Sequence, residues 1–481
     1  MSEQFDVIVI GGGPVGENAA DRARKAGLTV ALVERHLVGG ECSFYACSPS
    51  KALLRPIHAT RASQRVQGSV GARLDPQGVL ARRDAWINRV GTTDTLDDGG
   101  QVGWLDHVGI TLVRGVGRLV RERAVEVGDR RLEARHAVVL STGSRAFLPD
   151  IPGLADAHPW TNREATTSRV IPDRLAILGG GVVACEMAQV YAALGSNVTV
   201  LSRSSLLARN EPFAGEAVAD ALRRDGVDLR FGVSATSVSR RGPSGEVTLA
   251  LDDATTLTVD ELLVATGRVP ATADLGLDSV GARTNEHGYV VVNERMEVAL
   301  GHGGEPDPSR PTVPWLYAVG DVNGIALLTH MGKYQARAAG DLIGARAAGR
   351  DPDPDLTTPF ATGLGPPQVV FTDPEVSGAG LTEREARARG IRVRVVDVPM
   401  DSAAGSGLQA EGYQGQLRAI VDEDAGVLVG VTLVGQDVAE LVHAATVAIV
   451  GRVPLTTLWH AVPSYPTMSE IWLRVLEAYG I

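Results

Sequence analysis

The sequence has little of what marks a disordered, secreted or membrane-spanning protein. Charged residues make up 21% of the 481 residues and hydrophobic residues 44%, too few charges for a disordered chain. No run of about eighteen apolar residues occurs, so no membrane-spanning helix is predicted. Three cysteines cannot build the disulfide framework of a small secreted domain. Aromatic residues are scarce at 4%, whereas 56 glycines favour an α/β protein with many tight strand-to-helix turns.

The charge balance argues against two classes of partner. Lys and Arg total 46 against 57 Asp and Glu, and the resulting net charge of -11 would repel phosphate backbones and anionic lipids. The polar start, Met1 to Asp6, runs directly into an apolar strand without the pattern of a signal peptide. We therefore expect a cytoplasmic protein with no nucleic-acid or membrane partner. In a reducing compartment, closely spaced cysteines are more often redox-active or metal-binding than structural.

Apolar strand-like runs alternate with helical patterns, which predicts parallel sheets covered by helices. Strands are expected at Val7–Ile10, Val30–Val33, Leu175–Leu178 and Val198–Leu201. After about residue 352 the pattern changes to an α+β module, with strands at Val369–Phe371 and Val427–Val434 and helices at Val438–Val450 and Met468–Ala478. The Gly- and Pro-rich stretch Gly301–Pro314 is expected to be an exposed connection. We place the domain boundaries near residues 150, 270 and 352.

The first nucleotide-binding fingerprint is complete. Gly11, Gly13 and Gly16 follow a strand and open a helix, and Glu34 ends the next strand 23 residues after Gly11. Glycines let the backbone approach a pyrophosphate, the helix N-terminus supplies N–H donors, and the acid binds a ribose hydroxyl pair. This segment predicts a dinucleotide site.

A second, similar segment differs at the ribose position. Gly179 and Gly181 open the loop and Ala184 stands at the third position, a permitted variant. The following strand ends in Leu201-Ser202-Arg203, without a carboxylate. Arg203 and Arg209 are available to bind a 2′-phosphate, so NADP(H) is favoured over NAD(H).

Two cysteines stand in the segment Gly39-Gly40-Glu41-Cys42-Ser43-Phe44-Tyr45-Ala46-Cys47. In a regular helix, residues five apart are separated by about 7.5 Å in rise alone, beyond the roughly 7 Å Cα limit for a disulfide. The segment is therefore expected to be distorted if Cys42 and Cys47 join. No further Cys or His stands nearby at metal-ligand spacing, so no metal site is predicted.

These segments resemble the pyridine nucleotide-disulfide oxidoreductase family over nearly the whole chain. The resemblance also includes Ser141-Thr142-Gly143, Ala265-Thr266-Gly267-Arg268, Tyr317-Ala318-Val319-Gly320-Asp321 and the C-terminal Pro466-Thr467 with Ser469-Glu470. It implies an α/β fold of two Rossmann-like dinucleotide-binding domains, for FAD and NAD(P), plus a C-terminal α+β dimerisation domain. The expected ranges are 1–150 with 271–351, 151–270, and 352–481. It also implies a homodimer whose subunits share the active site.

The resemblance assigns roles to individual residues. Cys47 would face the flavin and Cys42 would meet the substrate. Lys51 matches the family lysine beside flavin N5, and Glu186 matches its carboxylate partner. Asp321 resembles the residue that binds the flavin ribitol, and the further cofactor-binding positions are Gly40, Thr142, Gly143, Gly267 and Gly320. Cys185 is expected to be a small buried helix residue.

The pattern departs from the family near the C-terminus. Where the disulfide reductases carry an acid–base histidine paired with a glutamate, this chain has Tyr465, with Glu470 in the glutamate position. A phenol ordinarily ionises at a pKa of about 10 and is a poor proton acceptor at pH 7. His460, five residues upstream, is an alternative acid–base group. Mercuric reductases also have tyrosine here, but their C-terminal cysteine pair is missing, since no cysteine follows Cys185.

We therefore expect an FAD-dependent oxidoreductase that passes electrons between NADP(H), flavin and the Cys42/Cys47 pair. The acceptor is a small thiol or disulfide, with a quinone or metal ion as alternatives. A second hypothesis is a flavin-dependent dithiol oxidase that forms a disulfide in a small molecule, with oxygen as the final acceptor. A third is a flavin-bound protein with a decayed site that acts as a binding partner.

Overall fold

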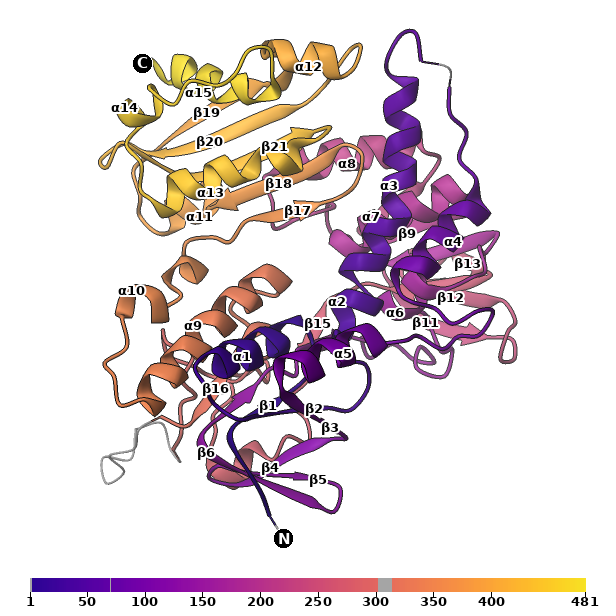
Figure 1. The fold of residues 1–481 in the computed structure, drawn as a ribbon. Helices are drawn as coiled ribbons and strands as arrows, with labels where there is room; N and C mark the ends of the chain where they lie inside the picture. Colours follow the sequence, from indigo (N-terminus) through magenta and orange to yellow (C-terminus); the bar gives the residue numbers. More distant parts are fainter. Residues whose placement is uncertain (1, 70, 302–313) are drawn as a thin grey trace. The chain divides into compact units, whose positions relative to one another are not determined.

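The computed structural model describes residues 2–69, 71–301 and 314–481. The chain forms two compact units, each assembled from three stretches of sequence (Figure 1). The first comprises residues 1–48, 85–145 and 268–363, and the second comprises residues 49–84, 146–267 and 364–481. The division into three domains expected from the sequence stays a prediction. Most of the expected connection Gly301–Pro314 lies outside the described residues.

The first unit is built on a seven-stranded sheet. Its order is β3-β2-β1-β6-β5-β4, with β16 also paired to β6, and the strands β1, β2, β3, β6 and β16 run parallel. The strands are β1 (Glu3–Ile10), β2 (Val30–Glu34), β3 (Ile110–Arg114), β4 (Gly117–Arg121), β5 (Ala124–Val127), β6 (Arg130–Leu140) and β16 (Leu316–Ala318). In β1, Ile8 and Ile10 enter one apolar cluster and Val7 and Val9 another. Both faces of this central strand are therefore buried, which explains its unbroken apolar run.

Helices, 3-10 turns and one short strand pair complete the first unit. They are the helices α1 (Pro14–Lys25), α2 (Gly40–Phe44), α5 (Gly99–Val108), α9 (Thr329–Ala347) and α10 (Pro354–Thr357), the 3-10 turns η1 (Leu277–Val280), η2 (Gly320–Asn323) and η3 (Phe360–Gly363), and the short strand pair β7 (Ser144–Ala146) with β15 (Arg268–Pro270). Helix α3 (Cys47–Gln64) begins in this unit and continues into the second.

Helix α9 lies unusually close to α1 (Figure 1). A Cβ added at Gly332 would be 2.5 Å from Val15 Cγ2, and one at Gly344 would be 2.6 Å from the Cβ of Ala26. Glycine is therefore required at these positions for backbone approach. The guanidinium of Arg22 forms a bidentate ion pair with Asp341 across the same contact. Small residues and one ion pair thus fix how α9 sits on α1.

The second unit contains another parallel sheet, with the order β10-β9-β8-β14. Its strands and helices are β8 (Arg174–Leu178), α7 (Val182–Leu194), β9 (Asn197–Ser202), α8 (Pro212–Arg224), β10 (Asp228–Phe231) and β14 (Glu261–Val264). A three-stranded antiparallel sheet, β11 (Ala235–Arg240), β12 (Val247–Leu251) and β13 (Thr256–Val259), adjoins it, and α4 (Pro76–Trp86) and α6 (Asn162–Thr167) are the remaining helices.

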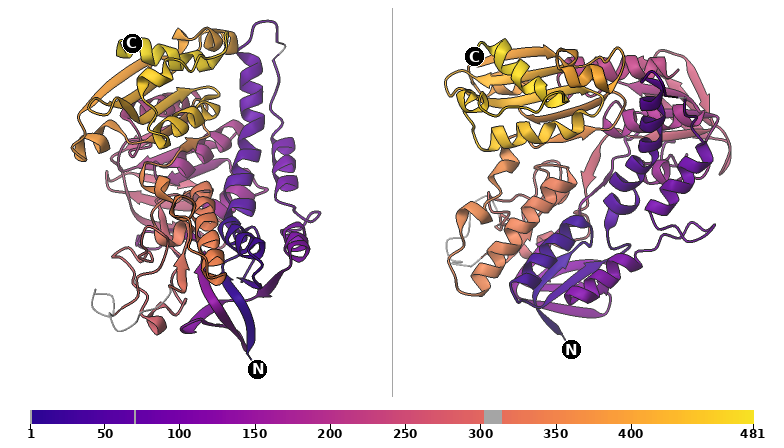
Figure 2. Two further views of the ribbon diagram at one scale, coloured as in Figure 1. Left: turned by 60° about the vertical axis from the view of Figure 1, so that its left-hand side comes forward. Right: turned by 45° about the horizontal axis from the view of Figure 1, so that its top comes forward.

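The C-terminal part of the second unit is a five-stranded antiparallel sheet with helices against it (Figure 2). The strands lie in the order β17 (Gln368–Val370), β18 (Glu375–Gly380), β21 (Val427–Gly435), β20 (Gln416–Asp422), β19 (Val393–Pro399). The helical segments are α11 (Glu383–Ala388), η4 (Met400–Ser402), α12 (Ala404–Gln409), η5 (Val438–Glu440), α13 (Val442–Val450), α14 (Leu455–Leu458), η6 (Met468–Glu470) and α15 (Ile471–Tyr479). Leu417 and Ala419 of β20 share one apolar cluster with residues of α13 and α15.

The strands and helices expected from the sequence are present. Each predicted strand overlaps an observed one, and the two C-terminal helices each begin with a 3-10 turn, η5 before α13 and η6 before α15. The expected α/β fold, with two parallel sheets and a C-terminal α+β module, is confirmed. Among the described residues, no helix is both long and apolar enough to cross a membrane.

Candidate redox site

The first glycine loop is tightly built around Glu34. The backbone N–H groups of Gly12 and His36 donate to the two oxygens of the Glu34 carboxylate at 2.6 and 2.7 Å. A Cβ at Gly11, whose φ is +108°, would lie 2.4 Å from the carbonyl oxygen of Ser141. Helix α1 then starts at Pro14 without a side-chain cap, so its N-terminal N–H groups face a ligand position. These features fit the pyrophosphate and ribose of a dinucleotide.

The second loop repeats this geometry with a different side chain at the ribose position. A Cβ at Gly180 would meet the hydroxyl of Ser202 at 2.5 Å, just as one at Gly12 would meet Glu34. Helix α7 also begins without a side-chain cap. Ser202 is buried, and Arg203 and Arg209 are exposed just beyond the end of β9. A hydroxyl therefore stands where the first loop has a carboxylate.

The two cysteines lie on either side of a break between helices. Helix α2 ends at Phe44, Tyr45 has a φ of -135° and a ψ of 0°, and α3 begins at Cys47. The expected distortion of this segment is confirmed. The side chains of Cys42 and Cys47 are hydrogen-bonded to each other, and Cys47 is the more exposed of the two.

The surroundings of Cys42 shift the pKa of its thiol in opposite directions. The hydrogen bond with Cys47 and burial raise the pKa of the Cys42 thiol above its ordinary value. A hydrogen bond from Thr329 and the charge of Lys333 lower that pKa. Thr329 also lies 3.4 Å from the Sγ of Cys47, measured from its Oγ1. The first turn of α9 therefore contacts both sulfurs.

Lys51 and Glu186 form an ion pair within the second unit. The Nζ of Lys51 lies 3.0 and 2.8 Å from the two carboxylate oxygens of Glu186. The backbone N–H of Phe371 donates to the same carboxylate at 3.0 Å, and the Phe371 ring centroid is 4.7 Å from the ammonium. Glu186 is buried on α7, whereas Lys51, on α3, is partly exposed. The pairing that the resemblance implies is present, and Cys47 and Lys51 are four positions apart on α3, one turn of helix.

Asp321 lies in a polar cluster at the start of η2. Its carboxylate accepts a hydrogen bond of 2.5 Å from the Ser144 hydroxyl, and Arg268 donates to the same hydroxyl at 2.6 Å. Burial raises the pKa of Asp321, and the nearby charge of Glu41 adds to the rise. Arg268 lies 3.3 Å from Glu41. Glu41 is thus tied, through Arg268, to the group expected to bind the ribitol.

The C-terminal segment contains the residues that depart from the family pattern. Tyr465 is 78% exposed, and His460 is also exposed. Glu470 is buried, and its Oε2 has no hydrogen-bond partner among the described residues, while Arg474 lies 4.0 Å from its other oxygen. Cys185 is buried in α7, as expected for a packing residue.

Two charged residues on the packed helices α1 and α9 were not singled out in the sequence. Glu17 is in the first turn of α1, and its burial raises its pKa to about 7, an effect that Lys333 opposes. Lys333 lies one turn after Thr329 on α9. Helix α1, which follows the first glycine loop, is rich in small residues, and a charged residue among them could have marked Glu17 in the sequence.

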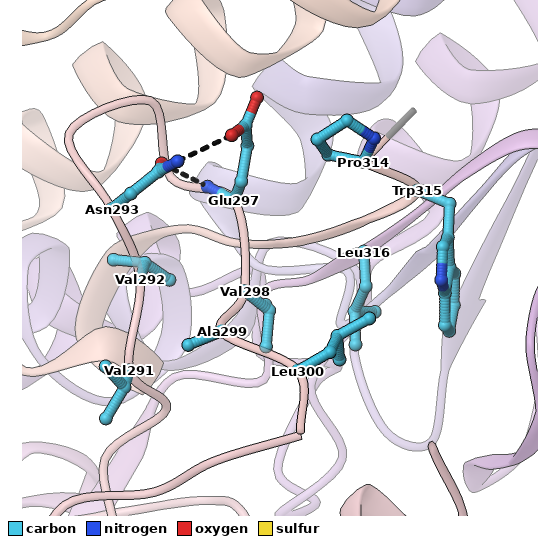
Figure 3. A pocket seen from close by; sticks show the side chains of 10 residues that line it. All are labelled: Val291, Val292, Asn293, Glu297, Val298, Ala299, Leu300, Pro314, Trp315 and Leu316. Carbon is cyan, nitrogen blue, oxygen red and sulfur yellow. Dashed lines mark hydrogen bonds between the residues drawn. The ribbon is translucent and has the colours of Figure 1, made fainter. Parts of the chain in front are cut away.

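A separate pocket lies in the first unit, away from the thiols and glycine loops in sequence (Figure 3). Within it, the Asn293 amide donates to the Glu297 carboxylate at 2.5 Å. Its lining is mostly apolar and consists of Val291, Val292, Asn293, Glu297, Val298, Ala299, Leu300, Pro314, Trp315 and Leu316. None of the candidate site residues lines this pocket. Among the residues with assigned positions, no group of three or more His, Cys, Asp or Glu side chains could hold a metal ion.

Two glycine loops, an adjacent thiol pair and a lysine paired with a buried glutamate are the features of a flavin- and nicotinamide-dependent oxidoreductase with a redox-active dithiol. The family model for pyridine nucleotide-disulphide oxidoreductases matches residues 5–339, and the model for their dimerisation domain matches residues 366–475. The chain belongs to this family. It is accordingly an enzyme of the flavoprotein disulfide reductase group with a Cys42–Cys47 redox pair, and its dimerisation domain indicates a homodimer.

The similarity to individual relatives extends over the whole length. Dihydrolipoyl dehydrogenase of Thermus scotoductus is 33% identical, covering 98% of this chain and 97% of the relative. Mercuric reductase of Shigella flexneri is also 33% identical, covering 98% of this chain and 80% of the relative. The HOCl-induced flavoprotein disulfide reductase RclA of Escherichia coli has a solved structure with 25% identity and a TM-score of 0.80, covering 98% and 99% of the two chains. RclA has also been solved as a Cu(II) complex, with a TM-score of 0.79.

Proposed function

We propose that this protein is an NADPH-dependent flavoprotein reductase whose Cys42/Cys47 pair passes electrons to a thiophilic metal ion, for which Cu(II) is the probe. One NADPH becomes NADP⁺ and a proton while two Cu(II) ions become two Cu(I). FAD, when bound, supplies the link between hydride transfer and the thiols. The observation that carries the proposal is that the thiol pair and the Lys51–Glu186 pair are intact while Tyr465 replaces the acid–base histidine.

The replacement of the acid–base histidine by Tyr465 should affect the reduction of a disulfide and the reduction of a metal ion differently. Reduction of a disulfide releases a thiolate that needs a proton, and a phenol is a weak acid–base group for that transfer. A metal ion bound to a thiolate accepts electrons without receiving a proton, and thiolates favour the Cu(I) product. RclA, which has been solved with Cu(II), and the mercuric reductases, which act on another thiophilic metal, support this choice of acceptor.

The residues of the first loop would hold FAD. Glu34 would bind the adenosine ribose, the loop of Gly11, Gly13 and Gly16 would approach the pyrophosphate, and Asp321 would bind the ribitol. Gly40, Thr142, Gly143 and Gly320 would line the same site. A Cβ at Gly40 would lie 2.8 Å from the Cα of Gly13, so the redox segment starts directly against the pyrophosphate loop.

NADPH is the proposed reductant because of the second loop. Gly179, Gly181 and Gly267 would border the coenzyme. Ser202 offers a hydroxyl where a carboxylate would repel a 2′-phosphate, and Arg203 and Arg209 would donate to that phosphate.

Lys51, held by Glu186, would place a positive charge beside the flavin, where negative charge develops on reduction. In the dimer, Tyr465 and Glu470 would belong to the partner-facing edge of the site.

The test is steady-state NADPH oxidation by the FAD-loaded protein with a panel of acceptors. The panel contains Cu(II), Hg(II), oxidised glutathione, lipoamide and a soluble quinone, and a Cu(I)-specific chelator reports the product. We expect Cu(II) turnover at least about tenfold above disulfide turnover. Cys42→Ser should abolish Cu(I) formation. Cys185→Ser, at the buried cysteine outside the site, should leave the rate unchanged.

Other outcomes assign other functions. Peroxide production from a small dithiol without nicotinamide, faster than any NADPH-driven rate, would identify a dithiol oxidase instead. Turnover of lipoamide or glutathione disulfide above that of Cu(II) would overturn the metal assignment. Equal Cu(I) formation by the wild type and Cys42→Ser would show that the thiols are not the route.

A further inference from the structure

The segment Gly40–Cys47, which carries both redox thiols, has little regular structure of its own. Helix α2 spans only five residues, and α3 begins anew at Cys47. At the end of α2, the backbone N–H of Tyr45 donates to the carbonyl of Glu41 at 2.7 Å. Helices shorter than about 12 residues are marginal on their backbone bonds alone. The positions of the two sulfurs therefore depend on contacts between this segment and the rest of the first unit.

The start of the segment is held by Glu41. Its carboxylate lies 3.3 Å from the guanidinium of Arg268 on β15, and the two side chains are only 23% and 25% exposed. The same guanidinium donates to the carbonyl and hydroxyl oxygens of Ser144 on β7 at 2.8 and 2.6 Å. Because the strand pair holds Arg268 in place, the residue next to Cys42 is fixed to the frame of the first unit.

The end of the segment is held by Tyr45. Its hydroxyl lies 2.8 Å from the Nε2 of His36, and the two rings are stacked with an interplanar angle of 14° and centroids 5.9 Å apart. His36 follows β2, and its backbone N–H donates to Glu34 at 2.7 Å. The guanidinium of Arg114, the last residue of β3, donates to the carbonyl of His36. Tyr45 thus joins the break between α2 and α3 to the ends of two parallel strands.

These two contacts flank the thiols. Glu41 directly precedes Cys42, and Tyr45 stands two positions before Cys47. A disulfide needs Cα atoms within about 7 Å, which an unbroken helix does not provide between residues five apart. The break at Tyr45 is what brings the sulfurs together, and they are hydrogen-bonded to each other. Side chains that fix the break therefore also fix how close the sulfurs stay.

We propose that Glu41 and Tyr45 are positioning residues that hold Cys42 and Cys47 in contact and so favour their disulfide over the dithiol. When the S–S bond forms, the two thiols give up two electrons and two protons, which the oxidant takes. A mobile dithiol segment would lose conformational freedom at this step, whereas a segment already held in place loses little. The held couple consequently has a lower reduction potential, and its thiols are a stronger reductant for any acceptor. The inference does not depend on which acceptor is used.

The experiment measures the equilibrium between the Cys42/Cys47 dithiol and disulfide. FAD-loaded protein is equilibrated without oxygen in mixtures of reduced and oxidised dithiothreitol, over a wide range of ratios. Reduced dithiothreitol gives two electrons and two protons to the protein disulfide and becomes its own cyclic disulfide. Alkylation of the free thiols, followed by peptide mapping, reports the fraction of protein in each form. The equilibrium constant for disulfide formation follows from these fractions.

Each contact can be removed by a small change. Tyr45→Phe deletes only the phenol oxygen and Glu41→Gln only the charge, and each should lower the equilibrium constant for disulfide formation at least about threefold. The double variant should lower it close to tenfold, or about 30 mV, because the contacts act at different ends of the segment. His36→Leu should match Tyr45→Phe, and the two together should add nothing further. The controls Glu286→Gln, at an exposed turn, and Tyr479→Phe, in α15, should match the wild type.

The proposal is overturned if both single variants keep the wild-type equilibrium constant, or if either shifts the equilibrium toward the disulfide. It is equally overturned if the losses of Tyr45→Phe and His36→Leu add, since the phenol would then act through another neighbour. Tyr45→Phe leaves the cluster around Asp321 untouched and decides the proposal even where Glu41→Gln binds FAD less tightly. The proposed function is decided separately by wild-type Cu(II) reduction, which a wrong role for Glu41 and Tyr45 leaves intact.

Discussion

The ammonium of Lys51 lies 2.8 and 3.0 Å from the two oxygens of the Glu186 carboxylate, across 135 residues of sequence. Glu186 is almost fully buried, with a side-chain exposure of 4%. Its carboxylate also accepts the N–H of Phe371, the residue that follows β17. The pair therefore fixes a lysine one turn after Cys47 on the same helix.

Removing the Glu186 charge should destabilise the second unit. In Glu186→Gln the partly exposed Lys51 loses its counterion but can turn toward water, so we expect a loss of about 1–3 kcal/mol rather than the full cost of breaking a buried pair. The melting midpoint should fall by several degrees in a thermal shift measurement. Asp21→Asn removes the exposed Lys25 pair and should change the midpoint by less than about one degree. A Glu186→Gln midpoint equal to that of the wild type would contradict this interpretation.

The preference for NADPH over NADH should depend on the residues at the end of β9, which are Ser202, Arg203 and Arg209. Each charge-assisted hydrogen bond to a 2′-phosphate contributes about 1.5–3 kcal/mol. Arg203→Ala with Arg209→Ala should therefore lower kcat/KM for NADPH by at least about tenfold and leave the NADH value nearly unchanged. Ser202→Glu should reverse the preference by copying Glu34 of the first loop. The matched control is Arg224→Ala, at the exposed end of α8. Equal losses with both coenzymes would argue against a phosphate contact.

The close contact of α9 with α1 should tolerate no methyl group. Gly332→Ala would place a Cβ 2.5 Å from Val15 Cγ2 and 3.0 Å from the Cα of Gly320, so we expect a loss of about 1–3 kcal/mol. Gly103, in α5, has open space around it, and Gly103→Ala should stabilise by about 0.5–1 kcal/mol through helix propensity. Thermal melting of both variants is the measurement. Destabilisation by Gly103→Ala as large as that by Gly332→Ala would remove the packing explanation.

Stability should fall with rising pH because of Glu375. Burial raises the pKa of this β18 carboxyl from 4.5 to about 7, and Asp437, Asp373 and Glu440 add to the rise. Between these two pH values the folded protein binds more protons than the unfolded chain, so unfolding becomes easier as pH rises.

Glu375→Gln removes this dependence, which amounts to about 3 kcal/mol between pH 4.5 and 7. The variant should therefore gain in melting temperature over the wild type at pH 8 and lose that gain near pH 4.5. Glu17, whose pKa is raised in the same direction, contributes equally to both proteins, so the difference between them isolates Glu375. A constant difference in melting temperature across this range would show that Glu375 does not titrate in it.

The sequence was most informative about features formed by residues that are close together in the chain. The glycine loops, the strand ends at Glu34 and Ser202, and the break between Cys42 and Cys47 are all local, because backbone sterics and helix rise act over a few residues. Each of these is found at the predicted place in the structure. The Lys51–Glu186 pair was expected only by resemblance to relatives, because no local rule joins positions so far apart.

The sequence by itself determined which segments form the two glycine loops, where the redox thiols stand and that Tyr465 occupies the position expected for the acid–base histidine, since these are statements about residue type and spacing. Only the tertiary structure decided which charges act on those thiols. Helices α1 and α9 are separated by more than three hundred residues, and their close packing depends on glycines that let α9 approach α1. Electrostatic interactions depend on distance in space and on burial, and both are set by packing rather than by position in the chain.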